Sequence, residues 1–165
     1  MQGNNPDDGV DADSAPANSQ KSARPIAEIT VFDVDERFLG YISDIARERD
    51  FPIKCVQYDL REPVPAEYIG AFDAVVTDPP YTHSGLSLFL SRICGLLTPE
   101  PNKHIYLSYA HKSPQTLLEA QKLIINSGCL ISRIFPKFNR YVGAQMLGGV
   151  SDMLVLRTSR SVTPR

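Results

Sequence analysis

The sequence predicts an α/β protein in which strands and helices alternate along the chain and an antiparallel pair of strands closes one edge of the sheet. Short apolar segments of strand length alternate with longer amphipathic segments, and the last two apolar segments have no helix between them. The composition, 42% hydrophobic and 22% charged over 165 residues, is that of one globular domain with a core.

The first part of the chain is expected to lie outside this domain. Apart from Met1, residues 1–24 contain Val10 as their single bulky apolar residue and are rich in Asp, Asn, Ser, Ala and Pro. Burial cannot offset the entropy lost on ordering such a segment. We therefore expect a disordered tail over residues 1–24 and a folded domain over residues 25–165.

Composition also predicts the compartment and limits the partners. The chain has no apolar run of membrane-spanning length and no signal-peptide pattern, which predicts a cytoplasmic protein without membrane contact. Cys55, Cys94 and Cys129 are odd in number and lie among apolar residues, as expected for buried free thiols. The formal net charge of −2 gives no basic footprint for nucleic acid. The histidines share no metal-ligand spacing, so we expect no metal site.

The folded region begins with a strand, a helix and another strand. Residues 28–33, EITVFD, have strand composition, and residues 36–50 place apolar side chains at helical spacing. Residues 53–58 form the next strand, and a loop with two prolines leads to a further strand over residues 72–77. The almost continuous apolar run in that strand predicts burial on both of its faces.

The alternation continues to the end of the chain. Ser113 followed by Pro114 is a typical helix start, and Gly128 stands where a helix-ending residue with positive φ is expected. A glycine-containing turn region over residues 143–149 joins the last two strands. The other elements are one helix and three strands, predicted over residues 85–97, 103–109, 129–135 and 151–158.

The central stretch of the chain is FDAVVTDPPYTHSG, residues 72–85. Asp78 is the first carboxylate beyond the strand, and two prolines then keep the chain extended, so Asp78 and Tyr81 are presented to one space. In an open α/β sheet this space is the usual ligand crevice. A carboxylate there can orient and deprotonate an amine, and the face of a tyrosine can hold a cationic or sulfonium centre. The alternative is structural: Asp78 caps a loop on which Tyr81 packs.

Three acids follow predicted strands in equivalent places: Asp33, Asp59 and Asp78. The carboxyl ends of parallel strands open on one edge of a sheet, so we expect the three carboxylates to converge on one cleft. Asp33 can accept both hydroxyls of a ribose, and Asp59 can accept from an adenine amino group. The alternative treats each acid as a turn former at the end of a strand.

Four segments resemble one enzyme family. They are VFDVDERFL, YDLREPVP, FDAVVTDPPYTHSGLSLFLSR and PKFNRY. Over residues 29–158 the chain is similar to the C-terminal catalytic domain of the N4-bis(aminopropyl)spermidine synthases, the branched-chain polyamine synthases, with the DPPYT segment as the most specific part. The resemblance implies a class I methyltransferase-like, Rossmann-like fold. It also implies transfer of aminopropyl groups from decarboxylated S-adenosylmethionine to the secondary amine of spermidine, with release of methylthioadenosine.

The resemblance assigns roles to particular residues. Asp78 and Tyr81 are the expected catalytic residues, Asp33 the ligand of the donor ribose, and Asp59 with Leu60 the border of the adenine. The expected acceptor-binding residues are Pro79, Pro80, Phe138, Asn139 and Tyr141. Decarboxylated S-adenosylmethionine is then a co-substrate, no cofactor is tightly bound, the partners are a polyamine and a sulfonium nucleoside, and the candidate assembly is a homodimer.

The family places another strand and a Gly-Asp-Asp-Asp loop before the strand that ends at Asp33, and this sequence contains neither. We therefore expect a domain that is incomplete on its N-terminal side, a truncated product or one with a misplaced start codon, with little or no activity alone. The missing strand belongs between the strands that end at Asp33 and Asp78. These two strands should either pair directly or leave open edges.

Two other functions remain as alternatives. Amino methyltransferases that use S-adenosylmethionine and act on bases in nucleic acid also use an Asp-Pro-Pro-Tyr motif, but they need a surface for a flipped base. The second alternative is a non-catalytic truncated domain. The three readings differ in whether the chain binds a polyamine, a nucleic acid or neither.

Overall fold

The computed structural model describes residues 27–110, 113–141 and 149–159. The chain divides into two compact units, Met1–Val56 and Gln57–Arg165. The tail predicted over residues 1–24 and most of the turn region predicted over residues 143–149 lie outside the described residues.

The first unit contains a helix between two paired strands. In chain order its elements are β1 (Ile29–Asp33), α1 (Glu36–Arg49) and β2 (Ile53–Gln57). Asp35 caps α1, because its side chain accepts a hydrogen bond from the backbone N–H of Arg37. Asp50 ends the helix in the left-handed conformation, with φ of 53°. These elements follow the sequence prediction closely.

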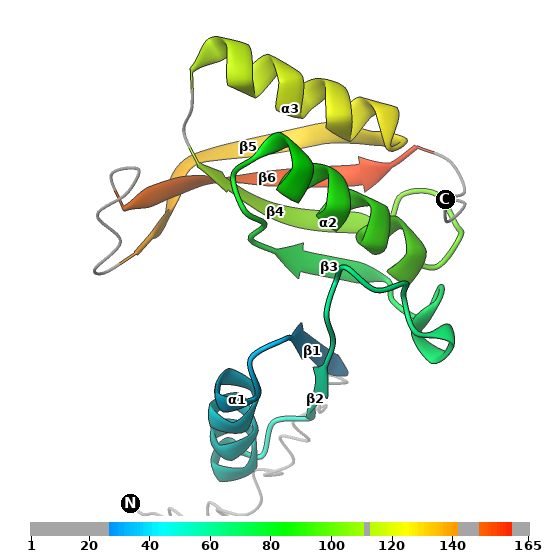
Figure 1. The fold of residues 1–165 in the computed structure, drawn as a ribbon, viewed down its shortest axis with the longest axis vertical. Helices are drawn as coiled ribbons and strands as arrows, with labels where there is room; N and C mark the ends of the chain where they lie inside the picture. Colours follow the sequence, from blue (N-terminus) through cyan, green and yellow to red (C-terminus); the bar gives the residue numbers. More distant parts are fainter. Residues whose placement is uncertain (1–26, 111–112, 142–148, 160–165) are drawn as a thin grey trace, which may run out of the picture. The chain divides into compact units, whose positions relative to one another are not determined.

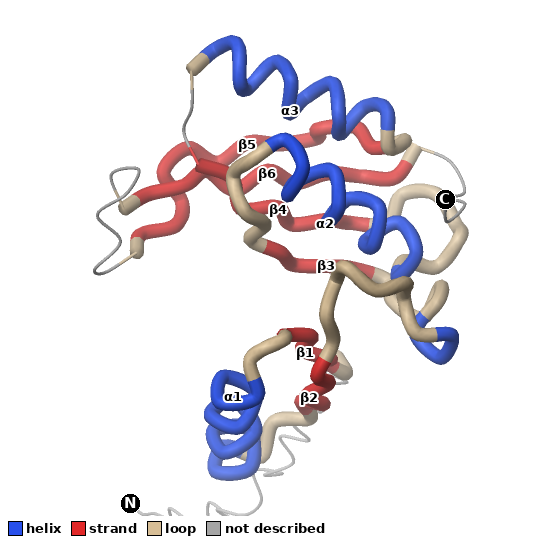
Figure 2. Tube along the Cα trace, viewed as in Figure 1, coloured by secondary structure: helices blue, strands red, loops and turns tan. Residues whose placement is uncertain are grey.

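The second unit is built on a four-stranded sheet in the order β3-β4-β6-β5 (Figure 2). Strand β3 is parallel to β4, and β6 is antiparallel to both β4 and β5. The predicted antiparallel C-terminal edge is therefore confirmed. The elements of this unit are the 3-10 helix η1 (Ala66–Tyr68), β3 (Ala74–Thr77), α2 (His83–Leu96), β4 (His104–Ala110), α3 (Pro114–Asn126), β5 (Cys129–Arg140) and β6 (Val150–Thr158).

Helices α2 and α3 cover one face of this sheet (Figure 1). Apolar side chains of both helices form one core with the residues of β4 and β6 that point to the same side. Burial of each such side chain contributes about 1.5–3 kcal/mol relative to exposure. The most deeply buried members are Leu86, Leu90, Leu97, Ile105, Leu107, Ile124 and Leu156.

Local signals explain where the two helices begin and end. The side chain of Thr82 accepts from the backbone N–H of Gly85, so α2 starts two residues earlier than its apolar pattern predicts. Ser113 caps α3 and Pro114 occupies its first turn, as predicted. Gly128 has a φ of 84° just beyond α3, which confirms its expected role in ending the helix.

Strand β3 corrects the prediction that it is buried on both faces. Val75 is half-buried and packs against the core under α2 and α3, whereas Val76 is 75% exposed. An apolar run without alternation was taken as a sign of two buried faces, but β3 is the edge strand of its sheet. Strands β1 and β3 belong to different sheets, so the direct pairing considered for them is not observed.

Strand β5 is longer than the predicted strand over residues 129–135. It continues to Arg140 through two register irregularities, and Lys137 adopts a φ of 52° at the second one. Pro136 is tolerated because β5 is an edge strand, where a missing backbone N–H leaves no ladder bond unmade. This extension brings Asn139 into register with Ser151 of β6.

Two further sequence predictions concern the burial of the cysteines and the absence of a membrane-spanning segment. All three cysteines are free; Cys94 and Cys129 are buried as predicted, whereas Cys55 on β2 is half-buried. No helix in the described part of the chain combines the length and the apolar character needed to cross a membrane.

Candidate functional site

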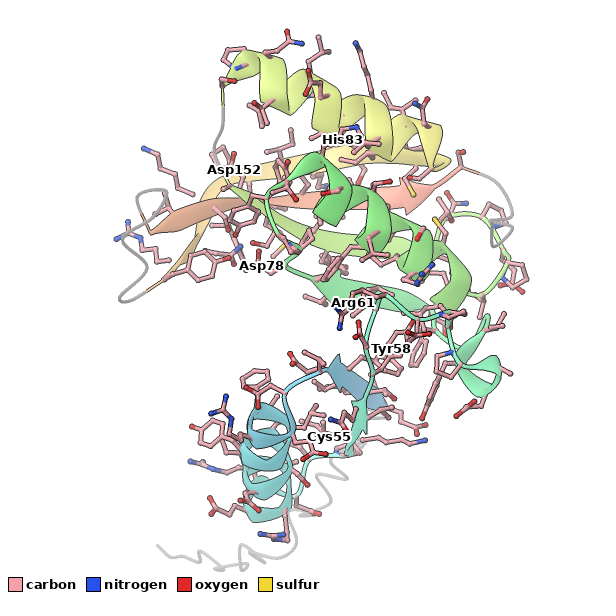
Figure 3. The ribbon with its side chains drawn as sticks, in the orientation of Figure 1. Cys55, Tyr58, Arg61, Asp78, His83 and Asp152 are labelled. Carbon is pink, nitrogen blue, oxygen red and sulfur yellow. The ribbon has the colours of Figure 1, made fainter. Side chains whose placement is uncertain are left out.

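Asp78 lies directly beyond the last residue of β3, where the chain turns toward α2 (Figure 3). Two tyrosine hydroxyls hold its carboxylate. The Tyr81 hydroxyl donates to Oδ1 over 2.7 Å, and the Tyr141 hydroxyl donates to Oδ2 over 2.7 Å. The carboxylate is exposed, so both oxygens keep lone pairs that a ligand can reach.

The ring of Tyr81 is held in place by the Tyr109 ring and by the hydrophobic core. It meets the ring of Tyr109 edge-on, with centroids 5.5 Å apart and an interplanar angle of 73°, and it packs against the core. Burial raises the pKa of the Tyr81 hydroxyl, and its hydrogen bonds with Tyr141 and Asp78 raise it further. The hydroxyl therefore stays protonated at neutral pH and remains a donor to Asp78.

A close backbone approach shapes the turn between Asp78 and α2. A Cβ atom at Gly85 would lie 2.8 Å from the carbonyl oxygen of Pro80 and 2.9 Å from the Thr82 Oγ1 atom. Glycine therefore lets the first turn of α2 fold back on the proline segment. Pro79 is fully buried and Pro80 is exposed, so Pro80 is the proline with a surface that an acceptor could touch.

A polar cluster on the sheet supports Tyr141. Its hydroxyl lies 2.8 Å from the Oγ of Ser108 and 3.0 Å from the Oγ of Ser151. The Asn139 side-chain nitrogen donates to both serines, over 3.1 Å and 2.9 Å. Tyr141 and Asn139 are thus brought together with Asp78, and their role in acceptor binding stays a prediction. The sequence reasoning missed both serines; the available signal was a serine within each of two strands of the sheet.

The loop after β2 holds Asp59 in an ion pair. Both carboxylate oxygens accept from the Arg61 guanidinium, and Oδ1 also accepts from the Arg61 backbone N–H. Hydrogen bonds to the Arg61 side chain, then to its backbone, lower the pKa of Asp59 to about 2. An adenine amino group at Asp59 would share this carboxylate with Arg61.

Arg92 of α2 secures the same loop. Its Nε donates to the Leu60 carbonyl oxygen over 2.8 Å, and its Nη2 donates to the Arg61 carbonyl oxygen over 3.2 Å. The Tyr58 hydroxyl adds a bond to the Glu62 carbonyl oxygen over 2.7 Å. The half-buried Arg92 side chain ties the loop to the helix that follows the Asp78 turn.

The remaining predicted residues are not joined to this network by the described contacts. Asp33 is the last residue of β1, in the first unit, and its Oδ1 accepts from the Asp35 backbone N–H over 2.8 Å. Convergence of Asp33 with Asp59 and Asp78 therefore stays a prediction. Phe138 is 61% exposed and packs on Phe135, with ring centroids 6.1 Å apart.

Comparison with known proteins identifies the relatives of this site. The family model described as the branched-chain polyamine synthase A C-terminal domain matches residues 17–161. An uncharacterised protein of Methanocaldococcus jannaschii is 41% identical over 124 residues, and the match covers 75% of this chain and 31% of that protein. The N(4)-bis(aminopropyl)spermidine synthase of the same organism is 31% identical over 118 residues, covering 70% of this chain and 34% of the enzyme. The chain thus spans about a third of the length of these relatives.

Solved structures share the fold. The branched-chain polyamine synthase of Thermus thermophilus, in complex with N4-aminopropylspermidine and 5'-methylthioadenosine, matches with a TM-score of 0.75 at 22% identity, over 82% of this chain and 45% of that chain. A methyltransferase from Pyrococcus furiosus matches with a TM-score of 0.58 at 16% identity, over 80% of this chain and 63% of that chain. These matches support the predicted methyltransferase-like fold. Together with the match over residues 17–161, they lead to one conclusion: the chain belongs to the branched-chain polyamine synthase A family, in the part that forms the C-terminal domain.

Proposed function

We propose that this domain takes part in aminopropyl transfer to the secondary amine of a polyamine, with Asp78 at the transfer site. The observation that carries the proposal is the exposed Asp78 carboxylate, oriented by the hydroxyls of Tyr81 and Tyr141 at the end of β3. Membership of the family supports it. So does the solved relative with a polyamine and a methylthio nucleoside bound.

The proposed reaction is a displacement at carbon. The lone pair of the polyamine nitrogen forms a bond to the carbon next to the sulfonium of decarboxylated S-adenosylmethionine. The carbon–sulfur bond breaks, its electron pair stays on sulfur, and neutral methylthioadenosine leaves. The nitrogen gives up one proton, so its single N–H group must face an acceptor while its lone pair faces the carbon.

Asp78 suits that acceptor role. Each carboxylate oxygen already accepts one tyrosine hydroxyl, which fixes the plane of the carboxylate and leaves one lone-pair direction per oxygen for an N–H donor. Bonds between a cationic amine and a carboxylate are about twice as strong as those between neutral groups. The negative charge also favours the developing ammonium over a neutral competitor.

The donor nucleoside is proposed to use the residues that follow β1 and β2. Asp33 would accept the ribose hydroxyls, and Asp59 with Leu60 would border the adenine. Arg92 supports this assignment for the loop, because it holds the Leu60 and Arg61 carbonyl groups in place. Phe138, an exposed aromatic side chain on β5, is proposed to contact the acceptor.

The test compares two carboxylates, one at each end of β3. Asp78→Asn keeps the shape of the side chain but removes its charge. Asp73→Asn makes the same change at the start of β3, where the carboxylate pairs with Lys103 over 2.6 Å. Calorimetric titration with spermidine, in the presence of methylthioadenosine, measures acceptor affinity. We expect Asp78→Asn to weaken it about 10- to 150-fold, the range for hydrogen bonds to a charged group.

Three readouts separate the proposal from its alternatives. Asp73→Asn should bind the polyamine like the wild type, and both variants should bind methylthioadenosine with unchanged affinity. Where release of methylthioadenosine from decarboxylated S-adenosylmethionine and spermidine is measurable, Asp78→Asn should slow it about 10²- to 10⁴-fold. Equal polyamine affinities in all three proteins would remove Asp78 from the site. Transfer of labelled methyl groups to DNA or RNA, with no polyamine affinity, would instead establish the nucleic-acid alternative.

A further inference from the structure

The polar cluster of Ser108, Asn139 and Ser151 spans three neighbouring strands beside the Asp78 site. Asn139 and Ser151 are direct partners in the β5–β6 ladder, and Ser108 lies on β4, on the other side of β6. The side chains of Ser108 and Ser151 are 4% and 0% exposed, and their Oγ atoms lie 2.7 Å apart. Buried hydroxyls without partners destabilise a fold by about 1–3 kcal/mol each, so the hydrogen bonds of this cluster are well determined.

Proton counting gives the direction of these bonds. An ionised carboxylate only accepts, so the single hydroxyl proton of Tyr141 is committed to Asp78 Oδ2. The side-chain nitrogen of Asn139 has two protons, and it donates to the two serine oxygens. Each serine oxygen therefore already accepts a bond and has its own proton to give.

The two serine protons have three oxygen contacts to serve. These contacts join Ser108 to Ser151 over 2.7 Å, Ser108 to Tyr141 over 2.8 Å, and Ser151 to Tyr141 over 3.0 Å. Two of these three contacts end on the Tyr141 oxygen, which makes it an acceptor within reach of both serines. Ser108 also has the Tyr81 oxygen as an acceptor. A serine proton donated to Tyr141 leaves the proton of Tyr141 for Asp78.

The same proton count can be made for the Tyr81 hydroxyl. Its proton goes to Asp78 Oδ1 over 2.7 Å, whereas the oxygens of Tyr81 and Tyr141 lie 3.4 Å apart, a longer and weaker contact. The two hydroxyls bracket the carboxylate without competing with it. Tyr81 is oriented by the Tyr109 ring, whereas Tyr141 contacts the serines through its hydroxyl.

We propose that three positioning residues, Ser108, Asn139 and Ser151, set the direction in which the Tyr141 hydroxyl donates. Through this bond they orient the Asp78 carboxylate to accept a hydrogen bond from the substrate amine. This inference rests on the proposed role of Asp78. Asn139 supplies protons to the serines, a serine supplies one to Tyr141, and Tyr141 supplies one to Asp78. When one member of the cluster is lost, the Tyr141 proton can turn toward a remaining serine oxygen, and Asp78 then loses one of its two anchors.

The test reads the Tyr141 hydroxyl directly and needs no turnover. In the full chain with 13C-labelled tyrosine, the ring carbon that bears the hydroxyl reports hydroxyl-proton exchange in mixed H2O and D2O, and Tyr141→Phe assigns the signal. Asn139→Asp replaces the donor with an acceptor of the same shape, and Ser108→Ala removes one donor to Tyr141. We expect each change to speed the exchange about 2- to 12-fold, as for the loss of one hydrogen bond.

Ser132→Ala is the matched control, because that serine lies on β5 and donates to the Val155 carbonyl oxygen over 2.8 Å instead of to the cluster. It should leave the Tyr141 exchange unchanged. The positioning role would be overturned if Asn139→Asp and Ser108→Ala both exchanged the Tyr141 hydroxyl proton at the wild-type rate while both kept the wild-type thermal unfolding midpoint. If one variant fails to fold, the other decides by the same criterion.

The cluster and the proposed function can fail separately. Faster exchange in the cluster variants, together with a polyamine affinity that Asp78→Asn does not change, would support the positioning of Tyr141 and overturn the transfer role of Asp78. Where turnover is measurable, the cluster variants should lower kcat and leave the KM for the nucleoside unchanged. A purely structural effect would lower the unfolding midpoint and raise both KM values.

Discussion

The Arg92 guanidinium donates to the carbonyl oxygen of Leu60 over 2.8 Å, a bond between α2 and the loop that carries Asp59. The same helix begins right after the Asp78 turn. One rigid element thus contacts the proposed adenine loop and carries the proposed transfer turn at its start. A side chain that satisfies two backbone carbonyl groups in this way fixes a loop more firmly than a surface ion pair does.

Arg92→Ala should loosen that loop. The backbone N–H of Glu62 donates to the Asp59 carbonyl oxygen over 2.9 Å, and its hydrogen exchange reports opening of the loop. Loss of the two bonds from a charged donor should speed this exchange about tenfold or more. Amide exchange followed by NMR or mass spectrometry measures it. Arg133→Ala, at an exposed position on β5, is the control and should leave the Glu62 amide unchanged.

Gly85→Ala should disturb the Asp78 turn, because the added Cβ meets the Pro80 carbonyl oxygen at 2.8 Å and backbone atoms must shift. We expect a loss of about 1–3 kcal/mol in the free energy of unfolding, as for overpacking, with weaker polyamine binding. Gly40→Ala in α1 has nothing within 4 Å of its new Cβ. Because alanine is the better helix former, it should be neutral or stabilise by up to about 1 kcal/mol. Similar denaturation midpoints for both variants would show that the turn has room.

The sequence was sufficient for the parts of the site that are local in the chain. A strand, an acid, two prolines and a tyrosine stand in one short segment, so Asp78 and Tyr81 could be placed together by turn chemistry alone. Tyr141 and Asn139 came from the family resemblance, because they reach Asp78 only through the β5–β6 pairing. The serines come together through the register of β4 on β6, which pairs residues far apart in the sequence and which local patterning does not specify.

The fold shows a similar division. Helix ends with side-chain caps, such as those at Asp35 and Ser113, were predictable because the capping bonds are local. The edge position of β3 was not, because a run of apolar residues looks the same in a central strand and in an edge strand. The strand predicted over residues 129–135 stopped before Pro136, although an edge strand can continue through a proline at a bulge.

The ion pair between Asp59 and Arg61 should give a pH-dependent contribution to stability. Arg61 lowers the pKa of Asp59 to about 2, below its usual value near 3.9, so the pair stabilises the fold above about pH 4. That contribution is lost as the pH falls from about 4 to about 2. In Arg61→Ala the backbone N–H bond remains, so the pKa of Asp59 should rise only part of the way.

A 13C titration of the Asp59 carboxyl carbon measures this shift, and urea unfolding at several pH values follows its effect on stability. The stability difference between wild type and Arg61→Ala should vanish near pH 2 and shrink in 1 M salt, because the pair is exposed and therefore screened. An equal pKa of Asp59 in the two proteins would show that Arg61 does not form the ion pair with this carboxylate in solution.

Val76 is expected to be the main site of self-association. Strand β3 is the edge of its sheet, and Val76 is 75% exposed next to the unpaired side of the strand. An exposed apolar edge strand offers unpaired backbone groups to another chain, and a charged side chain on such an edge opposes pairing. Val76→Lys should therefore reduce aggregation, measured by light scattering during incubation at rising protein concentration. It should change the free energy of unfolding by no more than about 0.5 kcal/mol.

Val75→Lys provides the contrast, because Val75 points to the opposite side of the same strand and packs against the core. A lysine there would bury a charge without a partner and should unfold the domain or destabilise it by several kcal/mol, about 3 or more. The alternation of faces along a strand makes this pair a direct test of the register of β3 on β4. If Val76→Lys were as damaging as Val75→Lys, both faces of β3 would be buried in solution. The edge strand would then be covered by another part of the protein or by a second molecule.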